Sequence, residues 1–136
     1  MKIDAGIMVK NPAEAGPAIK QLEDAGYDGA YSFEGAHDPF LPLVAAATNT
    51  SKIELITSIA VAFARNPMTL ANIGYDLNLV SKGRFILGLG SQIKPHITKR
   101  FSMPWSHPAA RMKEMVEAIK AIWDCWQNGT NLNYRG

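Results

Sequence analysis

Short apolar runs alternate along the chain with longer amphipathic segments. The apolar runs predict buried strands over residues 3–9, 27–33, 53–62 and 84–89. The last two runs are nearly continuous in apolar residues, which is typical of parallel strands covered on both faces. An Asx-Pro or His-Pro dipeptide follows each run and predicts a helix start, because an Asx side chain caps free N–H groups and proline fits the first helical position. The four dipeptides are Asn11-Pro12, Asp38-Pro39, Asn66-Pro67 and His107-Pro108.

Glycines mark the ends of the predicted helices, at Gly26, Gly83 and Gly129. Pro17 lies too deep for a helix that starts at Pro12, so the first helix either begins near Pro17 or is kinked there. The segment after the last proline dipeptide has the clearest helical pattern, with polar residues on its other side. Its apolar stripe, which we interpret as core packing, consists of Met112, Met115, Val116, Ile119, Ile122, Trp123 and Trp126.

The order of these elements predicts the architecture. Four successive strand–helix units without hairpin turns indicate parallel strands joined by right-handed crossovers. A doubly wound sheet and an eight-stranded barrel both have this order, but a dinucleotide-binding sheet needs a glycine-rich turn after its first strand. That turn here reads Met8-Val9-Lys10-Asn11. We therefore predict an α/β fold of the parallel (β/α)8 TIM-barrel type. Such a barrel has about 250 residues, so residues 1–136 are expected to be a single truncated segment, the half-barrel of the first four βα units.

Composition narrows the class of protein. Hydrophobic residues make up 47% and charged residues 19% of the chain, and 14 Lys+Arg against 12 Asp+Glu give a net charge of +2. These values are typical of a soluble globular protein and, without a basic cluster, do not favour a nucleic-acid partner. No apolar run reaches the roughly 18 residues of a membrane span, and Asp4 interrupts any signal-peptide core. A single cysteine, Cys125, favours a reducing compartment, and we expect a cytoplasmic protein.

Candidate chemistry lies at the carboxyl ends of the predicted strands, where barrels of this type build their active sites. Glu34 ends the second strand and is a candidate proton donor, and His37 follows it as a group that can titrate near neutrality. The alternatives are an ordinary loop carboxylate and a surface histidine. The segment 93–107 is longer than most βα connections, as active-site covers often are. No metal site is expected, since the sequence has no HExxH or CxxC motif.

Several segments carry motifs of one protein family. They are Ala25-Gly26-Tyr27-Asp28, the segment 34–42, the segment from Ser58-Ile59 to Arg65-Asn66-Pro67, and Ser81-Lys82-Gly83-Arg84-Phe85-Ile86-Leu87-Gly88-Leu89-Gly90, with Arg111-Met112-x-Glu114 further on. The run from Ser81 is the most specific of them. Together they resemble the luciferase-like superfamily of flavin and deazaflavin oxidoreductases, which includes bacterial luciferase and coenzyme F420-dependent enzymes. Gly90-Ser91-Gln92 with His96-Ile97 is most similar to the F420-dependent branch.

The resemblance implies an oxidoreductase that uses coenzyme F420 to move a hydride to or from a small organic substrate. In relatives an acidic residue, often beside a histidine, ends the second strand near the cofactor ring. Glu34 is the acidic residue here, Gly35 replaces the histidine, and His37 is the candidate to supply its function. Relatives also carry a non-prolyl cis peptide, which maps to Ser58-Ile59. The residues expected to line the ring are Thr57, Ser58, Ile59, Gly90, Ser91 and Gln92.

Two other functions are consistent with the sequence. Within the same superfamily, the chain could belong to an FMN-dependent monooxygenase. From a different class, it could be a non-catalytic half-barrel that packs against a partner, or a truncated product without activity. The absorbance spectrum of a co-purified cofactor separates the first alternative from an F420 enzyme.

The half-barrel interpretation predicts self-association. A barrel of this type closes with eight strands, so in a four-stranded piece the first and last strands are unpaired edges. Inward-facing residues, expected to include Ile7, Ile59 and Leu87, would lack an opposing wall. We therefore expect the purified chain to form homo-oligomers, measured by light scattering. A monodisperse monomer that unfolds cooperatively would contradict this interpretation.

Overall fold

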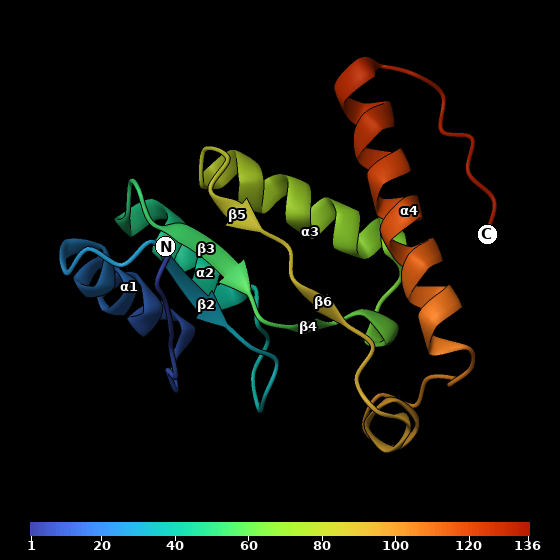
Figure 1. The fold of residues 1–136 in the computed structure, drawn as a ribbon, viewed down its shortest axis with the longest axis horizontal. Coiled ribbons are helices and arrows are strands. Elements are labelled where there is room, and N and C mark those ends of the chain that lie inside the picture. The colour runs from blue at the N-terminus through green and yellow to red at the C-terminus, as the bar shows by residue number, and fades with distance from the viewer. The chain divides into compact units, whose positions relative to one another are not determined.

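The computed structural model describes all 136 residues, which form two compact units. The first unit consists of Met1–Ala60 and Asp76–Leu89, and the second of Val61–Tyr75 and Gly90–Gly136. Figure 1 shows the order of the elements along the chain, from blue to red. Three elements contribute residues to both units, namely β4 (Ala60–Val61), α3 (Pro67–Val80) and β6 (Leu89–Gly90).

The first unit contains the parallel sheet that the sequence predicts. Its strand order is β1-β2-β3-β5, and every pair is parallel. The register aligns Ala5 with Ala30, Leu55 and Phe85 in one row across the sheet. The four strands are shorter than predicted: β1 is Asp4–Gly6, β2 is Gly29–Ser32, β3 is Glu54–Thr57 and β5 is Phe85–Ile86. The predicted third and fourth strands are each interrupted, at residues 58–59 and 87–88, so their last residues form β4 and β6.

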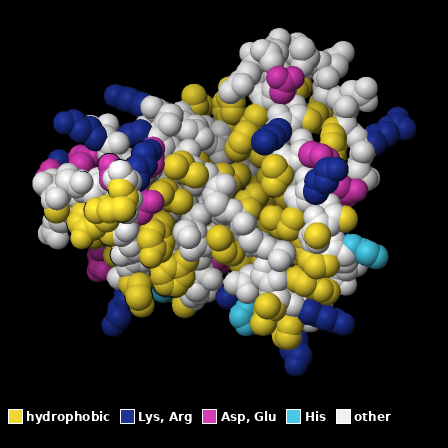
Figure 2. All heavy atoms as spheres, viewed as in Figure 1, with side chains coloured by type: hydrophobic (Ala, Val, Ile, Leu, Met, Phe, Trp, Pro, Cys, Tyr) yellow, Lys and Arg dark blue, Asp and Glu magenta, His cyan; other side chains and the backbone are white.

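The two faces of this sheet differ in burial. Helices α1 (Ala15–Asp24) and α2 (Leu41–Asn49) lie behind the strands in the view of Figure 1. Within this row Ala30, Leu55 and Phe85 are buried and Ala5 is half-buried, whereas Ile86, on the opposite face, is 44% exposed. Hydrophobic side chains are visible over the strands in the same view (Figure 2). Ile7 was expected on the open inner face, but this is wrong: it lies two residues beyond Ala5, on the covered face, and is only 9% exposed.

Two of the predicted helix starts are confirmed by their caps. The Asn66 side chain accepts from the Thr69 N–H, and α3 begins at Pro67. The Asn11 side chain accepts from the Ala13 N–H and starts a short 3-10 helix over Pro12–Glu14, after which α1 begins at Ala15. Pro17 therefore lies in the first turn of α1, where a proline is tolerated because the first N–H groups of a helix have no intrahelical acceptor.

Of the other two predicted helix starts, the one at Asp38-Pro39 lies two residues too early, and the one at His107-Pro108 is confirmed. Asp38 Oδ1 accepts from the backbone N–H groups of Phe40 and Leu41, so α2 begins at Leu41 rather than at Pro39. His107 does not cap α4 (Pro108–Asn128) with its side chain; instead its backbone takes a left-handed conformation with φ of 39°. An imidazole is not among the side chains that cap N-termini well, and α4 begins at Pro108 without a side-chain cap.

The first unit is held at the junction between α2 and β3 by Arg84. All five guanidinium N–H groups donate: Nε to Ser81 O, Nη1 to Thr50 Oγ1 and Ile53 O, and Nη2 to Ala47 O and Thr50 O. Two of these carbonyls, those of Ala47 and Thr50, lie at the end of α2, where the last C=O groups have no intrahelical donor. The arginine of the most specific sequence motif is therefore a structural group.

Glu23, near the end of α1, also binds the junction between α2 and β3. Its carboxylate accepts from the backbone N–H groups of Ser51, Lys52 and Ile53 at 2.7 to 3.0 Å, and it pairs with Lys20 at 3.3 Å. Burial alone would raise the pKa of the Glu23 carboxyl, but these donors stabilise the charged form and lower the pKa to about 2.

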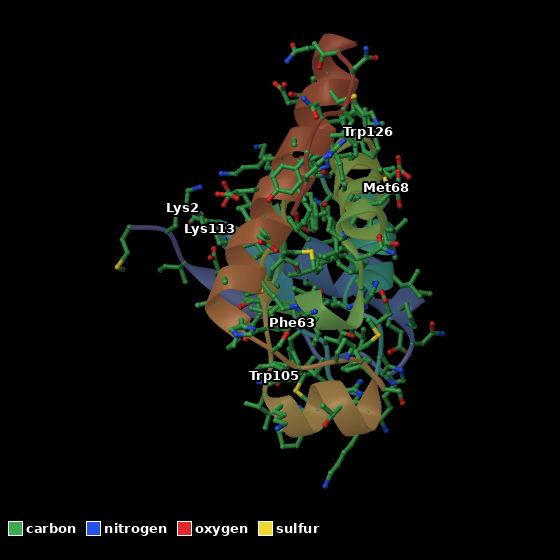
Figure 3. The ribbon with its side chains drawn as sticks, turned by 90° about the vertical axis from the view of Figure 1, so that its right-hand side faces the viewer. Lys2, Phe63, Met68, Trp105, Lys113 and Trp126 are labelled. Carbon is green, nitrogen blue, oxygen red and sulfur yellow. The ribbon has the colours of Figure 1, made fainter.

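The second unit is formed around α4. The buried side of α4 carries Met115, Ala118, Ile119 and Ile122, and the helix ends at Gly129 with φ of 65°. Three of these belong to the predicted apolar stripe, whereas its members Val116 and Trp126 are exposed. The Trp123 indole N–H donates to Ala71 O in α3. Edge-to-face aromatic pairs join Phe63 to Trp105 and Tyr75 to Trp126, with ring centroids 5.6 and 5.3 Å apart; Phe63, Trp105 and Trp126 are labelled in Figure 3.

The predicted long loop before α4 contains helical structure. His96–Arg100 forms a π-helical turn in which Ile97 is buried. None of the helices combines the length and the apolar character that crossing a membrane requires.

Because the pKa of Glu23 is lowered in the folded state, we expect the free energy of unfolding to depend on pH. Because the folded pKa of about 2 lies below the reference value of 4.5, the contribution of Glu23 is complete above pH 4.5 and is lost as the pH falls towards 2. The shift corresponds to about 3 kcal/mol of unfolding free energy. In urea unfolding followed by circular dichroism, Glu23→Gln should remove most of this pH dependence. The exposed Glu14→Gln is the control, and equal pH dependence in the two variants would contradict the assignment.

Candidate functional site

The candidate site lies at the carboxyl ends of β2 and β3 in the first unit. The Ser58 N–H donates to Ser32 O at 2.7 Å, and the Glu34 N–H donates to Ile59 O at 3.1 Å. These two bonds place the segment that follows β2 beside the segment that follows β3. The Ser58–Ile59 peptide bond is cis, which confirms the prediction from the family resemblance.

Thr57 and Gly88 join this site to the segment after β5. The buried Thr57 hydroxyl donates to Gly88 O and accepts from Gly88 N, both at 2.9 Å. The Ala60 N–H also donates to Gly88 O at 2.9 Å. A Cβ atom added to Gly88 would lie 1.9 Å from Thr57 O, so only glycine allows this approach.

The residues predicted to line a cofactor ring differ in accessibility. Ser58 is exposed and Ile59 is half-buried, so both present atoms to a ligand, whereas Thr57 is fully buried and its hydroxyl is engaged by Gly88. The structure thus brings Glu34, Thr57, Ser58 and Ile59 together, with Thr57 as a group that positions the backbone.

The other three predicted ring residues, Gly90, Ser91 and Gln92, belong to the second unit. Gly90 ends β6, and the Ser91 hydroxyl donates to Gln92 O at 3.2 Å. Gln92 takes a left-handed backbone conformation with φ of 58°. All three residues are half-buried.

A pocket of about 300 Å³ opens where the chain leaves β1 and β2. His37 lines it, but Glu34 does not, so the two predicted catalytic residues occupy different places at the same end of the sheet. The apolar lining residues are Ile7, Met8, Val9, Phe33, Ala36 and Pro42, and the polar ones are Lys10, Ser32, His37 and Asp38. Sequence reasoning missed Lys10, because the segment 8–11 carries no motif; its position directly after a strand was the one available signal.

These residues suit a flat heteroaromatic ring. The Ile59 side chain and the backbone of the Ser58–Ile59 peptide offer a mainly apolar surface, and the backbone of Glu34, a residue with a polar side chain, is hydrogen-bonded to Ile59 O. An apolar surface bordered by a few polar groups is the usual lining of a small-molecule or cofactor site. The donor set therefore fits one side of a flavin-like ring.

A parallel βα fold with such a site at its strand ends places the chain in the general class of α/β proteins. The sequence pattern of the luciferase-like monooxygenase family matches residues 2–136, and the chain belongs to this family.

Curated relatives show the extent of the similarity. An uncharacterised protein of Mycobacterium tuberculosis is 58% identical over 136 residues, which cover all of this chain and 40% of that protein. A second M. tuberculosis protein, provisionally named a coenzyme F420-dependent oxidoreductase, is 28% identical over 113 residues, covering 82% of this chain and 33% of that protein. The chain thus spans about two fifths or less of the length of these relatives.

Solved structures share the fold. The coenzyme F420-dependent tetrahydromethanopterin reductase from Methanopyrus kandleri superposes with a TM-score of 0.77 at 23% identity, over all of this chain and 43% of that one. The oxygenating constituent of 3,6-diketocamphane monooxygenase from Pseudomonas putida, in complex with FMN, gives a TM-score of 0.77 at 18% identity, over 90% of this chain and 40% of that one.

The Thr57–Gly88 contact predicts that Gly88→Ala is destabilising. The added methyl group would separate the segments after β3 and β5, and we expect a loss of about 2–3 kcal/mol in the free energy of unfolding. Gly35→Ala is the matched control, since its Cβ would meet a movable Phe33 ring carbon at 3.3 Å. Urea unfolding measures both variants, and equal midpoints would show that the close approach is not needed for stability.

Proposed function

We propose that this chain forms the first four βα units of an eight-unit barrel, in an oxidoreductase that transfers a hydride between coenzyme F420 and a small organic substrate. The observation that carries the proposal is the hydrogen bond from the Glu34 N–H to Ile59 O, which holds an acidic residue beside the Ser58–Ile59 peptide. The F420-dependent proteins among the similar chains support the choice of cofactor.

Each residue of the site has a role in this proposal. Ile59 supports one face of the deazaflavin ring, and Ser58 offers its hydroxyl to the ring's polar edge. Thr57 and Gly88 keep that support in place through their paired hydrogen bonds. Gly90, Ser91 and Gln92 would complete the contacts to the ring. When bound, the deazaflavin supplies the hydride chemistry, and the protein supplies orientation and electrostatics.

Glu34 handles the proton that accompanies the hydride. When a substrate carbonyl is reduced, its oxygen must gain a proton, and when an alcohol is oxidised, its oxygen must lose one. A carboxyl group within reach of that oxygen serves both directions as general acid or general base. His37 lines the neighbouring pocket and is proposed to hold the polar group of the substrate.

An FMN-dependent monooxygenase is the second candidate, because a structure with the same fold contains FMN. The two candidates are distinguished by the visible absorbance of cofactor bound to the longest native protein that contains this chain. A flavin spectrum, together with no binding of added F420, would overturn the first proposal.

Glu34→Gln tests the assigned proton transfer in that same longest native protein. The amide keeps the shape of the side chain and removes its titrating group, so turnover should fall by about 100-fold or more. The dissociation constant for F420 should stay within about twofold, because the cofactor is held mainly by other groups. The exposed Glu14→Gln serves as the control. Unchanged turnover in Glu34→Gln would remove Glu34 from the mechanism.

A further inference from the structure

Of the polar side chains that line the pocket beside β1 and β2, two form hydrogen bonds within the chain. The Ser32 hydroxyl donates its only proton to Pro39 O. Asp38 Oδ1 accepts from the N–H groups of Phe40 and Leu41 at 2.8 and 3.1 Å. Both side chains thus hold the connection between β2 and α2, through the Ser32 hydroxyl proton and through Asp38 Oδ1.

Lys10 and His37 are different. Both are exposed and line the pocket, and no hydrogen bond or ion pair within the chain engages either side chain. A lysine ammonium has three donors and no acceptor, and an imidazole offers at least one N–H donor. The polar groups of the pocket that remain for a ligand therefore favour an acceptor, and a charged acceptor most of all.

The walls of the pocket are apolar and accessible. Met8 is 88% exposed and Phe33 is 43% exposed, although side chains of this kind are usually buried. A volume of about 300 Å³ lies at the lower end of the range for small-molecule sites. An occupant should therefore bring a short hydrocarbon portion as well as an acceptor group.

We propose that this pocket binds a small amphipathic carboxylate, with its hydrocarbon chain against Met8 and Phe33 and its carboxylate at Lys10 and His37. A cationic ligand is disfavoured, because it would meet the Lys10 ammonium, while Asp38 Oδ1 already accepts from two backbone N–H groups. Phe33 and Gly35 flank Glu34 in the chain and both line the pocket. As a statement about the substrate of an oxidoreductase, the inference rests on the function proposed above; as a binding site, it stands on these contacts alone.

Hexanoate is the probe, compared with hexan-1-ol and hexylammonium, which share its hydrocarbon chain. The 15N-labelled 136-residue chain is titrated without cofactor while its amide resonances are followed. Hexanoate should shift the amides of residues 8–10 and 33–37, with a dissociation constant of about 1 mM, as expected for so small a ligand. The alcohol and the ammonium should bind at least about fivefold more weakly, since neither offers a charged acceptor.

Variants of Lys10 separate the charge from the hydrocarbon contacts. Lys10→Gln should weaken hexanoate binding about tenfold, the loss of one charge-assisted hydrogen bond, and Lys10→Arg should restore most of it. Lys52→Gln is the matched control, because Lys52 is an exposed lysine that precedes the amino end of β3.

Three results would overturn the proposal: equal binding of hexanol and hexanoate, shifts confined to other residues, or no change in Lys10→Gln. Should Lys10→Gln fail to fold, the amide spectrum reveals it, and the salt dependence of hexanoate binding in Lys10→Arg decides instead: binding insensitive to salt contradicts the ion pair. Because the titration contains no cofactor, its results do not depend on whether the protein binds F420. The proposal of a carboxylate site and the proposal of an F420-dependent function can therefore be refuted independently.

Discussion

The connection between α2 and β3 lies between two charged side chains, and the first unit depends on this arrangement. Glu23 accepts from the N–H groups of residues 51–53, and Arg84 donates to the carbonyls of Ala47, Thr50 and Ile53. A carboxylate thus satisfies the N–H donors of one short segment, and a guanidinium satisfies its C=O acceptors. Without these partners, the backbone groups that folding removes from water would be left unpaired, at a cost in stability. Since Ile53 immediately precedes β3 and Phe85 follows Arg84, the two charges determine how β3 and β5 enter the sheet.

Backbone hydrogen bonds at the ends of these strands determine the geometry of the candidate site. Thr57 ends β3 and bonds to both backbone groups of Gly88, and Ile59 O receives the N–H of Glu34. Most of the groups that build the proposed ring support are therefore peptide groups, and their positions follow from the strand register. Side-chain chemistry is confined to a few positions, of which Glu34 and Ser58 are the accessible ones in the first unit.

Much of this fold could be predicted because it depends on local signals. The parallel order followed from repeated strand–helix units, and Asn11 and Asn66 cap helices as their dipeptides indicate. The predicted start of α2 at Pro39 was wrong, because the Asp38 side chain can also accept from the N–H of Leu41, where the helix begins. The predicted face of Ile7 was wrong, because packing decides which of the two alternating sets of side chains in a strand is buried. The pocket with Lys10 joins residues that are distant in the chain, which periodicity does not reveal. The cis bond at Ser58–Ile59 was reached only through family resemblance.

The contacts at the candidate site also bear on the choice of cofactor. Flavins and deazaflavins share a flat tricyclic ring, and the surface formed by Ile59 and its neighbouring peptide would support either ring equally. Discrimination requires groups that differ in their interaction with the two rings, which means polar groups at the ring edge. In the proposal these groups are the Ser58 hydroxyl and the Glu34 carboxyl in the first unit, and Ser91 and Gln92 in the second. The architecture that supports a ring is thus separable from the few side chains that select it, which explains how one fold accommodates enzymes of both kinds.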